Sequence, residues 1–429
     1  YENKSLSLPL NGGCELPLIV PIESLQPGMK VAGDVLGDGG QLLLARGARL
    51  SHQRIESLRR HGILSIKVLL PSDEEEADEA LVPSNIALKV RRQIREIYDF
   101  ARSKKALPEE VLYEVTEEIA SIIEGIFSAS NLVFSDMKHL ANHDEYTYEH
   151  SWMATLFSLA LMRVAAEEGF ITHPDFQTRL DLGIGALLHD IGKMRILPEI
   201  LNKPGPLSAE EWEIMKMHPQ WGWEMVRKNS TIMPLARGIV LHHHQRWDGT
   251  GYGPASGVLL KGGEIPEVVR LVTVADTYDA LISDRPYRPA FLPVEALEIL
   301  KEEAGTKLDP NLAPLMSEIA VDYPTGCVVI SRDGAIVNVN APSRRGEPIR
   351  GLVIGSISER SWALVGKEAE IPRSSIHCGG TSLDNLARRL KGRPEEVSSI
   401  AQIDCNLSLK ALPPWQKLLE RALKPLIQG

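Results

Sequence analysis

The spacing of the hydrophobic positions changes twice along the chain, and each change indicates a different kind of structure. Residues 16–70 contain short alternating runs separated by turn signals, with a helical pattern at 51–61 and a strand pattern at 66–70. Between residues 85 and 322 the apolar positions recur with the period of about 3.6 residues that is typical of amphipathic helices. From residue 323 the period returns to two. The sequence therefore predicts a helical region between two β-containing regions.

These changes predict a multidomain α+β protein. Its domains are expected to be a small α+β module at residues 1–71, a central all-α bundle at 85–322 and a β-rich domain at 323–429. Residues 72–84 are predicted to form an acidic linker, because their like charges repel one another and they offer no apolar face.

The β-rich domain carries clear local signals. Hydrophobic runs at 327–330 and 335–339 flank the turn Arg332-Asp333-Gly334 and predict a hairpin, which a further strand at 349–354 follows. Residues 415–426 form an amphipathic pattern after two prolines. This pattern predicts a terminal helix whose apolar face packs against the rest of the protein.

The composition narrows the class of protein. Apolar residues make up 43% and charged residues 24% of the chain, as in ordinary globular proteins, which argues against a disordered chain and a membrane protein. The formal net charge of −10 repels nucleic-acid polymers, so no DNA or RNA partner is expected. No apolar run reaches the roughly 18 residues that a membrane-spanning helix needs. We therefore expect no membrane span.

The cysteines and the first residues indicate the compartment. The four cysteines lie far apart, without the paired spacing of a disulfide framework or a thiolate metal site. The first residues lack the basic and apolar regions of a secretion signal. We expect a cytoplasmic protein.

Six of the 12 histidines lie within motifs of the helical region that look like metal ligands. They occur on or beside predicted helices that include 180–190, 210–227 and 268–282. The groups able to bind a metal are His150, His189, Asp190, His218, His242, His243, His244 and Asp276. Each histidine alone is more often a packed core or surface side chain, so the argument depends on the whole set.

Two doublets in this set favour a pair of metal ions. Adjacent residues on a helix point about 100° apart, so a single ion seldom binds both. Two ions about 3.5–4 Å apart can, with a carboxylate such as that of Asp190 between them. The doublets His189-Asp190 and His243-His244 therefore favour a binuclear centre.

The donor set indicates the chemistry. Imidazole and carboxylate ligands without a thiolate suit iron, manganese, zinc, nickel or cobalt, and affinity alone does not choose among them. A hydroxide held between two divalent ions is ionised near neutral pH, and the pair can stabilise both the attacked and the leaving oxygens of a phosphodiester. Metal-assisted phosphodiester hydrolysis is the reaction class that we predict.

Neighbouring residues suit a phosphate substrate. Lys193 follows the first doublet by three residues, and Arg285 and Arg288 offer two guanidinium groups on a proline-stiffened loop. A solvated lysine and ion pairs at a helix end are the alternatives for these residues. The glycine-rich stretch at 247–253 allows a close approach of backbone to a ligand, although alone it indicates only a turn.

Motifs within residues 136–320 resemble those of the HD-GYP family of cyclic-dinucleotide phosphodiesterases, a branch of the HD hydrolase superfamily. The motifs are Tyr146-Thr-Tyr-Glu-His150-Ser, Leu187-Leu-His189-Asp190-Ile-Gly-Lys193, Ile200-Leu-Asn-Lys-Pro-Gly205, His218-Pro, His243-His244-Gln-Arg-Trp-Asp-Gly-Thr-Gly-Tyr252, Val274-Ala-Asp276-Thr-Tyr-Asp279-Ala-Leu and Arg285-Pro-Tyr-Arg288. The resemblance implies that the central region is an HD-type helical bundle. Residues 21–29 also resemble, more weakly, a small module that often precedes this domain.

The resemblance implies a role for each motif residue. The cofactors are expected to be two divalent metal ions, with iron or manganese favoured and zinc, nickel, cobalt and magnesium as alternatives. The expected ligands are His150, His189, Asp190, His218, His243, His244 and Asp276. Catalytic roles are expected for Asp190 and Lys193, and substrate contacts for Lys193, Asp279, Arg285, Arg288 and Tyr252. His242 is left as an outer or exposed residue.

The sequence departs from the family pattern at three places. Gly253 replaces the proline that ends the family signature, and Gln245 stands where glutamate is common. Tyr146 occupies the position of a glutamate that holds a third metal in some members, which favours two metals here. The loop at Gly251 and Tyr252 is a candidate docking site for a protein partner, and the sequence does not indicate an oligomeric state.

The function that we predict is hydrolysis of cyclic di-GMP to linear pGpG by a metal-bridging hydroxide, with further cleavage to GMP left open. One alternative is a cyclic-dinucleotide receptor with little turnover, which the departures at Gln245 and Gly253 suggest. Another is an HD hydrolase of a different nucleotide, such as cyclic GMP-AMP, because metal ligands alone do not distinguish bases.

Overall fold

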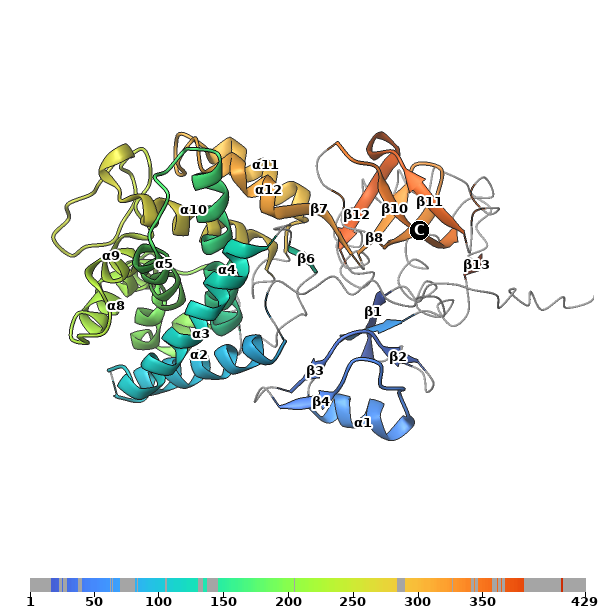
Figure 1. The fold of residues 1–429 in the computed structure, drawn as a ribbon, viewed down its shortest axis with the longest axis horizontal. Helices are drawn as coiled ribbons and strands as arrows, with labels where there is room; N and C mark the ends of the chain where they lie inside the picture. Colours follow the sequence, from blue (N-terminus) through green and yellow to red (C-terminus); the bar gives the residue numbers. More distant parts are fainter. Residues whose placement is uncertain are drawn as a thin grey trace, which may run out of the picture.

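The computed structural model describes residues 17–69, 82–136, 146–283, 290–381 and 410–411, apart from short gaps within these ranges (Figure 1). Helices dominate the middle of the chain, and strands precede and follow them. The predicted multidomain α+β class with a central helical bundle is confirmed.

The N-terminal part is a small α+β unit. Its elements are β1 (Pro17–Pro21), β2 (Lys30–Val31), β3 (Val35–Leu36), β4 (Leu42–Leu44), α1 (His52–Arg60) and β5 (Ser65–Leu69). The antiparallel sheet has the order β1-β5-β2, and β3 pairs with β4. The α1 helix begins where predicted, because the Ser51 side chain accepts a hydrogen bond from the Arg54 backbone N–H.

The central part is a bundle of helices around one apolar core. Its elements are α2 (Ser84–Lys104), α3 (Glu109–Ser128), α4 (Tyr146–Glu167), α5 (Phe176–Leu188), η3 (Ile191–Arg195), α6 (Pro198–Leu201), α7 (Ala209–Met215), α8 (His218–Val226), α9 (Pro234–His242), η4 (Gly262–Glu264), α10 (Glu267–Ile282), α11 (Pro293–Glu303), η5 (Ala313–Leu315) and α12 (Met316–Ile319). The α4 helix packs against α5 and α10, and α5 is buried from Asp181 to Leu188.

Two glycines let α5 lie deep in this core. A Cβ atom at Gly183 would lie 2.6 Å from Ile119 of α3, and one at Gly185 would lie 2.5 Å from Ile239 of α9. Neighbouring helices therefore approach the α5 backbone more closely than any side chain there would allow. This close packing fixes the C-terminal end of α5, where His189 and Asp190 follow.

One helix prediction was wrong. The pattern at residues 210–227 predicted a single helix, whereas the structure has α7 and α8 with a break between them. Pro219 lacks a backbone N–H, and its ring would clash with the Met215 carbonyl in a continuous helix. The break makes His218 the first residue of α8, and its Nδ1 lies 2.8 Å from the Met215 carbonyl oxygen.

The C-terminal part is built around an antiparallel sheet. Its elements are β7 (Ala320–Thr325), β8 (Val328–Ser331), β9 (Ala335–Val339), β10 (Ile349–Ser356), β11 (Glu368–Ile371), η7 (Arg373–Ser375), β12 (Ile376–Thr381) and β13 (Lys410–Ala411). The sheet order is β11-β10-β9-β8-β12, with β13 on β10. The predicted hairpin is present as β8 and β9, and Gly334 in its turn has a φ of 90°. The predicted helix at 415–426 lies outside the described residues.

A parallel strand pair connects the helical sequence to this sheet. The β6 strand (Phe134–Asp136) pairs with β7, which spans the predicted boundary between residues 322 and 323. The region predicted as all-α therefore contains the short β6 strand and the first residues of β7. Among the described helices, none combines the length and the apolar character that crossing a bilayer requires.

Candidate metal centre

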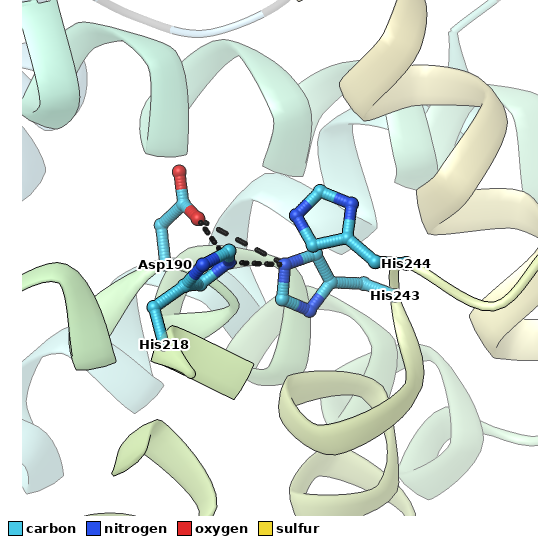
Figure 2. Close-up of side chains that lie close together, drawn as sticks. All are labelled: Asp190, His218, His243 and His244. Carbon is cyan, nitrogen blue, oxygen red and sulfur yellow. Dashed lines mark hydrogen bonds and ion pairs between the residues drawn. The ribbon is translucent and has the colours of Figure 1, made fainter. Parts of the chain in front are cut away.

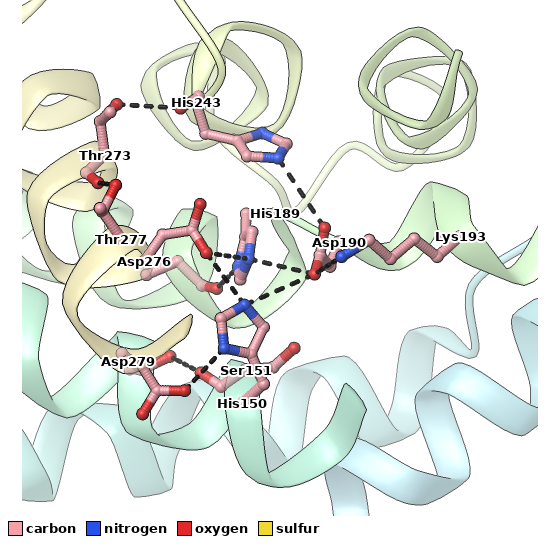
Figure 3. A network of polar contacts seen from close by, with 12 residues as sticks. His150, Ser151, His189, Asp190, Lys193, His243, Thr273, Asp276, Thr277 and Asp279 are labelled. Atoms are coloured by element: carbon pink, nitrogen blue, oxygen red, sulfur yellow. Dashed lines mark hydrogen bonds and ion pairs between the residues drawn. The ribbon is translucent and has the colours of Figure 1, made fainter. Parts of the chain in front are cut away.

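Five separate segments bring the seven predicted metal-binding residues to one place. His150 comes from α4, and Asp276 comes from α10. His189 is the C-cap of α5, and the next residue, Asp190, precedes η3. His218 begins α8, while His243 and His244 follow α9. Because these helices pack on one core, they bring together histidines and carboxylates that are far apart in the sequence (Figures 2 and 3).

The seven residues form two groups that could each hold a metal ion. We call His150, His189 and Asp276 the first group. The second group consists of Asp190, His218, His243 and His244, which Figure 2 shows. Within each group, one candidate ligand atom from every residue lies within 4.8 Å of the others.

The Asp190 carboxylate faces both groups. Its Oδ2 atom lies 3.4 Å from His189 Nε2 and 3.6 Å from His150 Nε2, in the first group. Its Oδ1 atom lies 3.2 Å from His218 Nε2 and 3.8 Å from His243 Nε2, in the second group. Each oxygen is therefore directed at a different group, as a bridging carboxylate requires.

Hydrogen bonds at Nδ1 orient three of the histidines. His189, His218 and His243 each place Nδ1 within 2.6–3.0 Å of the carbonyl oxygen three residues earlier. A carbonyl only accepts, so Nδ1 carries the proton and Nε2 keeps a lone pair directed at the cluster. The carbonyls lie in the last turn of α5, the last turn of α9 and the end of α7. At such helix ends, carbonyls lack partners within the helix.

His150 is oriented by a side chain instead. Its Nδ1 lies 2.7 Å from Asp279 Oδ2, and its Nε2 lies 3.0 Å from Asp276 Oδ1 (Figure 3). Both carboxylates belong to α10, and the contact with Asp279 is the shorter one. With the proton on Nδ1, the Nε2 lone pair faces a carboxylate oxygen across a gap that a cation would bridge.

Burial keeps most of these histidines neutral. It lowers the pKa of His150 to about 4, and it lowers the pKa of His218 as well. For His243 and His244, burial and the neighbouring histidines hold the pKa well below its usual value. Burial also lowers the pKa of His189, but the Asp190 carboxylate outweighs it and raises that pKa overall. Neutral imidazole is the form that binds metals.

The charge of Asp190 is maintained in the same interior. Burial alone would raise the pKa of this carboxyl group, but Lys193 and His189 hold the pKa well below its usual range. The Lys193 ammonium donates to Asp190 Oδ2 at 2.5 Å. An ionised carboxylate next to neutral imidazoles is a donor set suited to a divalent cation.

Several buried atoms of the cluster are arranged as a cation would require. His189 Nε2 and Asp190 Oδ1 are buried, and neither has a hydrogen-bond partner within the described ranges. His218 Nε2 and His243 Nε2 lie 3.1 Å apart although the Nδ1 atom of each ring faces a carbonyl. Two lone pairs that face each other at this distance repel unless a cation lies beside both. The residues therefore fit a metal site.

The other predicted site residues have different surroundings. Tyr252 stacks on His244, with ring centroids 4.5 Å apart, so it contacts a candidate ligand. Asp279 is fully buried behind His150 and does not face the solvent, which is the geometry of a supporting residue. Arg285 and Arg288 lie outside the described residues. His242 is half-buried at the end of α9, outside both groups.

Two of the departures from the family pattern occur together in one loop. Gln245 is buried, donates to the Tyr252 carbonyl oxygen at 3.0 Å and accepts from the Leu260 N–H at 2.8 Å. An ionised glutamate has no proton for the first of these bonds. Gly253 has a φ of +155°, and a Cβ atom there would lie 2.7 Å from the Leu241 carbonyl oxygen. Proline fixes φ near −65° and therefore cannot replace Gly253 in this conformation.

The third departure concerns the residues before His150. Glu149 forms an ion pair with Arg91 at 3.2 Å, so its carboxylate is engaged by α2 rather than by either group. Glu145 lies outside the described residues, and so does the Tyr146 side chain.

Sequence reasoning missed one supporting residue. The Thr273 hydroxyl, one helical turn before Asp276, lies 2.9 Å from the carbonyl oxygens of both His243 and Val269, so the two share its single proton. Residues three apart on a helix share a face, so the spacing from Asp276 was the available signal. Threonine on a helix is so common that this spacing alone does not single it out.

Residues 128–312 match the family model described as HD domain. This helical part of the chain is therefore similar to HD domains. The resemblance to HD-GYP phosphodiesterases that the motifs carry is confirmed as a likeness, because the relatives of this chain bear names of cyclic-dinucleotide phosphodiesterases.

Several relatives of this chain are named as phosphodiesterases of cyclic dinucleotides. The chain is 33% identical over 264 residues to a Pseudomonas aeruginosa protein named cyclic di-GMP phosphodiesterase PA4108, covering 62% of this chain and 59% of that protein. A Thermotoga maritima cyclic di-GMP phosphodiesterase is 34% identical, covering 49% and 53%. A Vibrio cholerae protein named 3'3'-cGAMP-specific phosphodiesterase 3 is 38% identical, covering 39% and 34%. The chain thus spans less than two thirds of the length of each of these relatives.

Among solved structures, Bd1817, an HDGYP protein from Bdellovibrio bacteriovorus, has a TM-score of 0.43 and 17% sequence identity. The match covers 70% of this chain and 98% of that chain.

Proposed function

We propose that this protein is a metal-dependent phosphodiesterase that hydrolyses a cyclic dinucleotide, with cyclic di-GMP as the first candidate. The observation that carries the proposal is the Asp190 carboxylate, whose two oxygens face two separate groups of metal-binding residues. The names of the relatives support the substrate class, since they act on cyclic di-GMP or on 3'3'-cGAMP.

The two groups are proposed to hold two divalent ions. His150, His189 and Asp276 would bind one ion and His218, His243 and His244 the other, with Asp190 between them. The donor set of imidazoles and carboxylates favours iron or manganese over softer metals. When bound, such a pair supplies Lewis acidity and an ionised water-derived nucleophile at neutral pH.

The residues of the chain would keep the site in its reactive form. Asp279 holds His150 with Nε2 facing the cluster, and the backbone carbonyls do the same for His189, His218 and His243. Lys193 keeps Asp190 ionised, and 19% of the Lys193 side chain is exposed. This position allows the same ammonium to contact a non-bridging phosphate oxygen.

Base recognition is proposed to involve residues at the edge of the site. Tyr252 stacks on His244 and contacts Trp212 at a ring distance of 5.9 Å, so two aromatic rings lie next to the second group. Aromatic rings at such a place suit the faces of nucleotide bases. Arg285 and Arg288 stay predicted phosphate or base contacts.

The experiment is a product analysis with defined metals. The purified chain is incubated anaerobically with Fe²⁺, or with Mn²⁺, and with cyclic di-GMP or 3'3'-cGAMP, and the nucleotides are separated by chromatography. The proposal predicts pGpG from cyclic di-GMP, and the proportion of GMP reports a second cleavage. Unchanged substrate peaks with every metal would contradict it, and cleavage of 3'3'-cGAMP alone would reassign the substrate.

A further inference from the structure

The α2 helix precedes the segment that matches the HD domain model, yet it reaches the metal centre. It spans Ser84–Lys104, whereas the match begins at residue 128. Its fully buried residue Tyr98 places a phenolic hydroxyl between α4 and α5, which carry ligands of the first group. None of the roles assigned above involves this residue.

The Tyr98 hydroxyl is bonded to both of these helices. It donates to the Leu187 carbonyl oxygen at 3.1 Å, and its oxygen lies 2.7 Å from Ser151 Oγ. A tyrosine hydroxyl has a single proton, so Ser151 is the donor of the shorter bond. Ser151 directly follows His150, and Leu187 precedes His189 by two residues. Leu187 lies in the last turn of α5, where side chains often satisfy the terminal carbonyls.

Other contacts show that α2 supports the back of the α4 turn that carries His150. Arg91 of α2 pairs with Glu149 at 3.2 Å, and the Tyr148 hydroxyl donates to Asp99 of α2 at 2.8 Å. The His150 ring points the other way, toward the carboxylates of α10. The α2 helix and the metal-binding groups therefore contact opposite sides of one helical turn.

We infer that Tyr98 is a positioning residue for the first group, so that α2 is an integral part of the metal centre. This inference rests on the proposed function. His150 and His189 come from different helices, and their ring centroids lie 5.2 Å apart. Their spacing depends on how α4 lies against α5, and the Tyr98 hydroxyl bonds to both helices beside the ligands. The phenyl ring alone fills space and makes neither hydrogen bond.

The test is the variant Tyr98→Phe, which keeps the ring and removes the hydroxyl. Metal affinity is measured by titrating Mn²⁺ into the metal-free protein in competition with a chelator. Loss of a hydrogen bond that supports ligands typically weakens metal binding by about 10–100-fold, and the indirect contact here suggests about 10-fold for one of two ions. Turnover of cyclic di-GMP should show a lower kcat with KM changed less than about twofold, because substrate contacts are unaltered.

Two control variants separate positioning from general stability. Tyr113→Phe removes the hydroxyl of a tyrosine on α3 that is 64% exposed, and it should bind Mn²⁺ like the parent protein. Val90→Ala removes buried apolar atoms from α2 two turns before Tyr98, and it should lower the melting temperature while leaving both ions bound.

The outcomes are distinguishable. Parent-like Mn²⁺ affinity and kcat in Tyr98→Phe would overturn the inference, as would equal metal loss in Val90→Ala at a matched melting temperature. If the parent protein cleaves no cyclic dinucleotide but Tyr98→Phe still binds Mn²⁺ more weakly, the proposed function fails and the positioning role of Tyr98 stands.

Discussion

The two groups of the candidate metal centre are held in different ways. In the second group, His218 and His243 bond at Nδ1 to backbone carbonyls three residues earlier, so their orientation is built into local backbone. In the first group, His189 is held by a backbone carbonyl in the same way, but His150 depends on the Asp279 carboxylate of another helix. The neighbour of His150, Ser151, bonds to Tyr98 of a third helix. The orientation of His150 is therefore a tertiary property, whereas that of His218 and His243 is largely a local one.

The two kinds of support should respond differently to substitutions. A carbonyl acceptor in the backbone remains when side chains change, but a side-chain acceptor can be removed by a single substitution. Mutations away from the ligands should therefore weaken the first group more than the second.

Asp190→Asn should weaken both groups at once. The amide removes the negative charge that faces both sets of histidines, and only one of its two terminal atoms can bind a cation. We expect more than a roughly 100-fold loss of kcat and loss of bound metal, measured by turnover and by elemental analysis. The matched control is Asp181→Asn, which changes a buried carboxylate on α5 that accepts a hydrogen bond from Gln177 and lies in neither group, and which should retain metal. Full metal content in Asp190→Asn would contradict the bridging arrangement.

Asp279→Asn should weaken only the first group. The Asn amide is neutral and can turn its NH₂ toward His150 Nδ1, so the imidazole loses its charged acceptor. About a 10–100-fold weaker binding of one of two Mn²⁺ ions is expected in a chelator competition. Asp175→Asn is the control, because this exposed carboxylate caps α5 and asparagine is an equally good cap. Equal weakening of both ions would show that the groups are not supported independently.

Gln245→Glu should destabilise the loop next to the second group. Its carboxylate would face the Tyr252 carbonyl oxygen, which now accepts a hydrogen bond from the buried amide. The carboxylate and the Tyr252 carbonyl oxygen would be two buried acceptors without a proton between them. This should lower the free energy of unfolding by about 1–3 kcal/mol, measured by denaturant titration. Because Tyr252 stacks on His244, KM should rise more than metal affinity falls. Gln53→Glu, at an exposed position of α1, should leave stability unchanged. Unchanged stability in Gln245→Glu would refute the proposed role of the amide.

Thr273→Val should have the smallest effect. It removes one hydrogen bond to the His243 carbonyl oxygen, but the contact of His243 Nδ1 with Val240 remains. We expect a change in Mn²⁺ affinity of less than about 10-fold, below the range for direct partners of ligands. Thr116→Val, which removes a hydroxyl that bonds within α3, provides the baseline. A larger effect than that of Asp279→Asn would reverse the contrast between the groups.

The sequence predicted which residues gather at the centre through motifs that resemble those of a known family, and the His189-Asp190 and His243-His244 doublets are local features that favoured two metals independently. It did not reveal how the ligands are supported. The sequence around Tyr98 does not distinguish a tyrosine that only fills the core from one that forms hydrogen bonds with Ser151 and Leu187. These partners lie 53 and 89 residues away along the chain. Such contacts follow only from the packing of helices.

The break before His218 shows another limit. The apolar period across 210–227 suited one helix, and the local effect of Pro219 decided otherwise. The conformation of the loop after His244 could not be predicted from the sequence either. The positive φ of Gly253 and the two hydrogen bonds of the Gln245 side chain depend on each other. Periodicity identifies elements, whereas backbone conformation at single residues sets where a ligand points.

The most direct test of the central claim is electron paramagnetic resonance of the Mn²⁺-loaded protein together with its metal stoichiometry. If Asp190 links two ions through its two oxygens, the protein will bind two Mn²⁺ per chain and give the spectrum of an exchange-coupled pair, which Asp190→Asn abolishes. A single bound ion, or two ions with spectra of isolated Mn²⁺, would contradict the account.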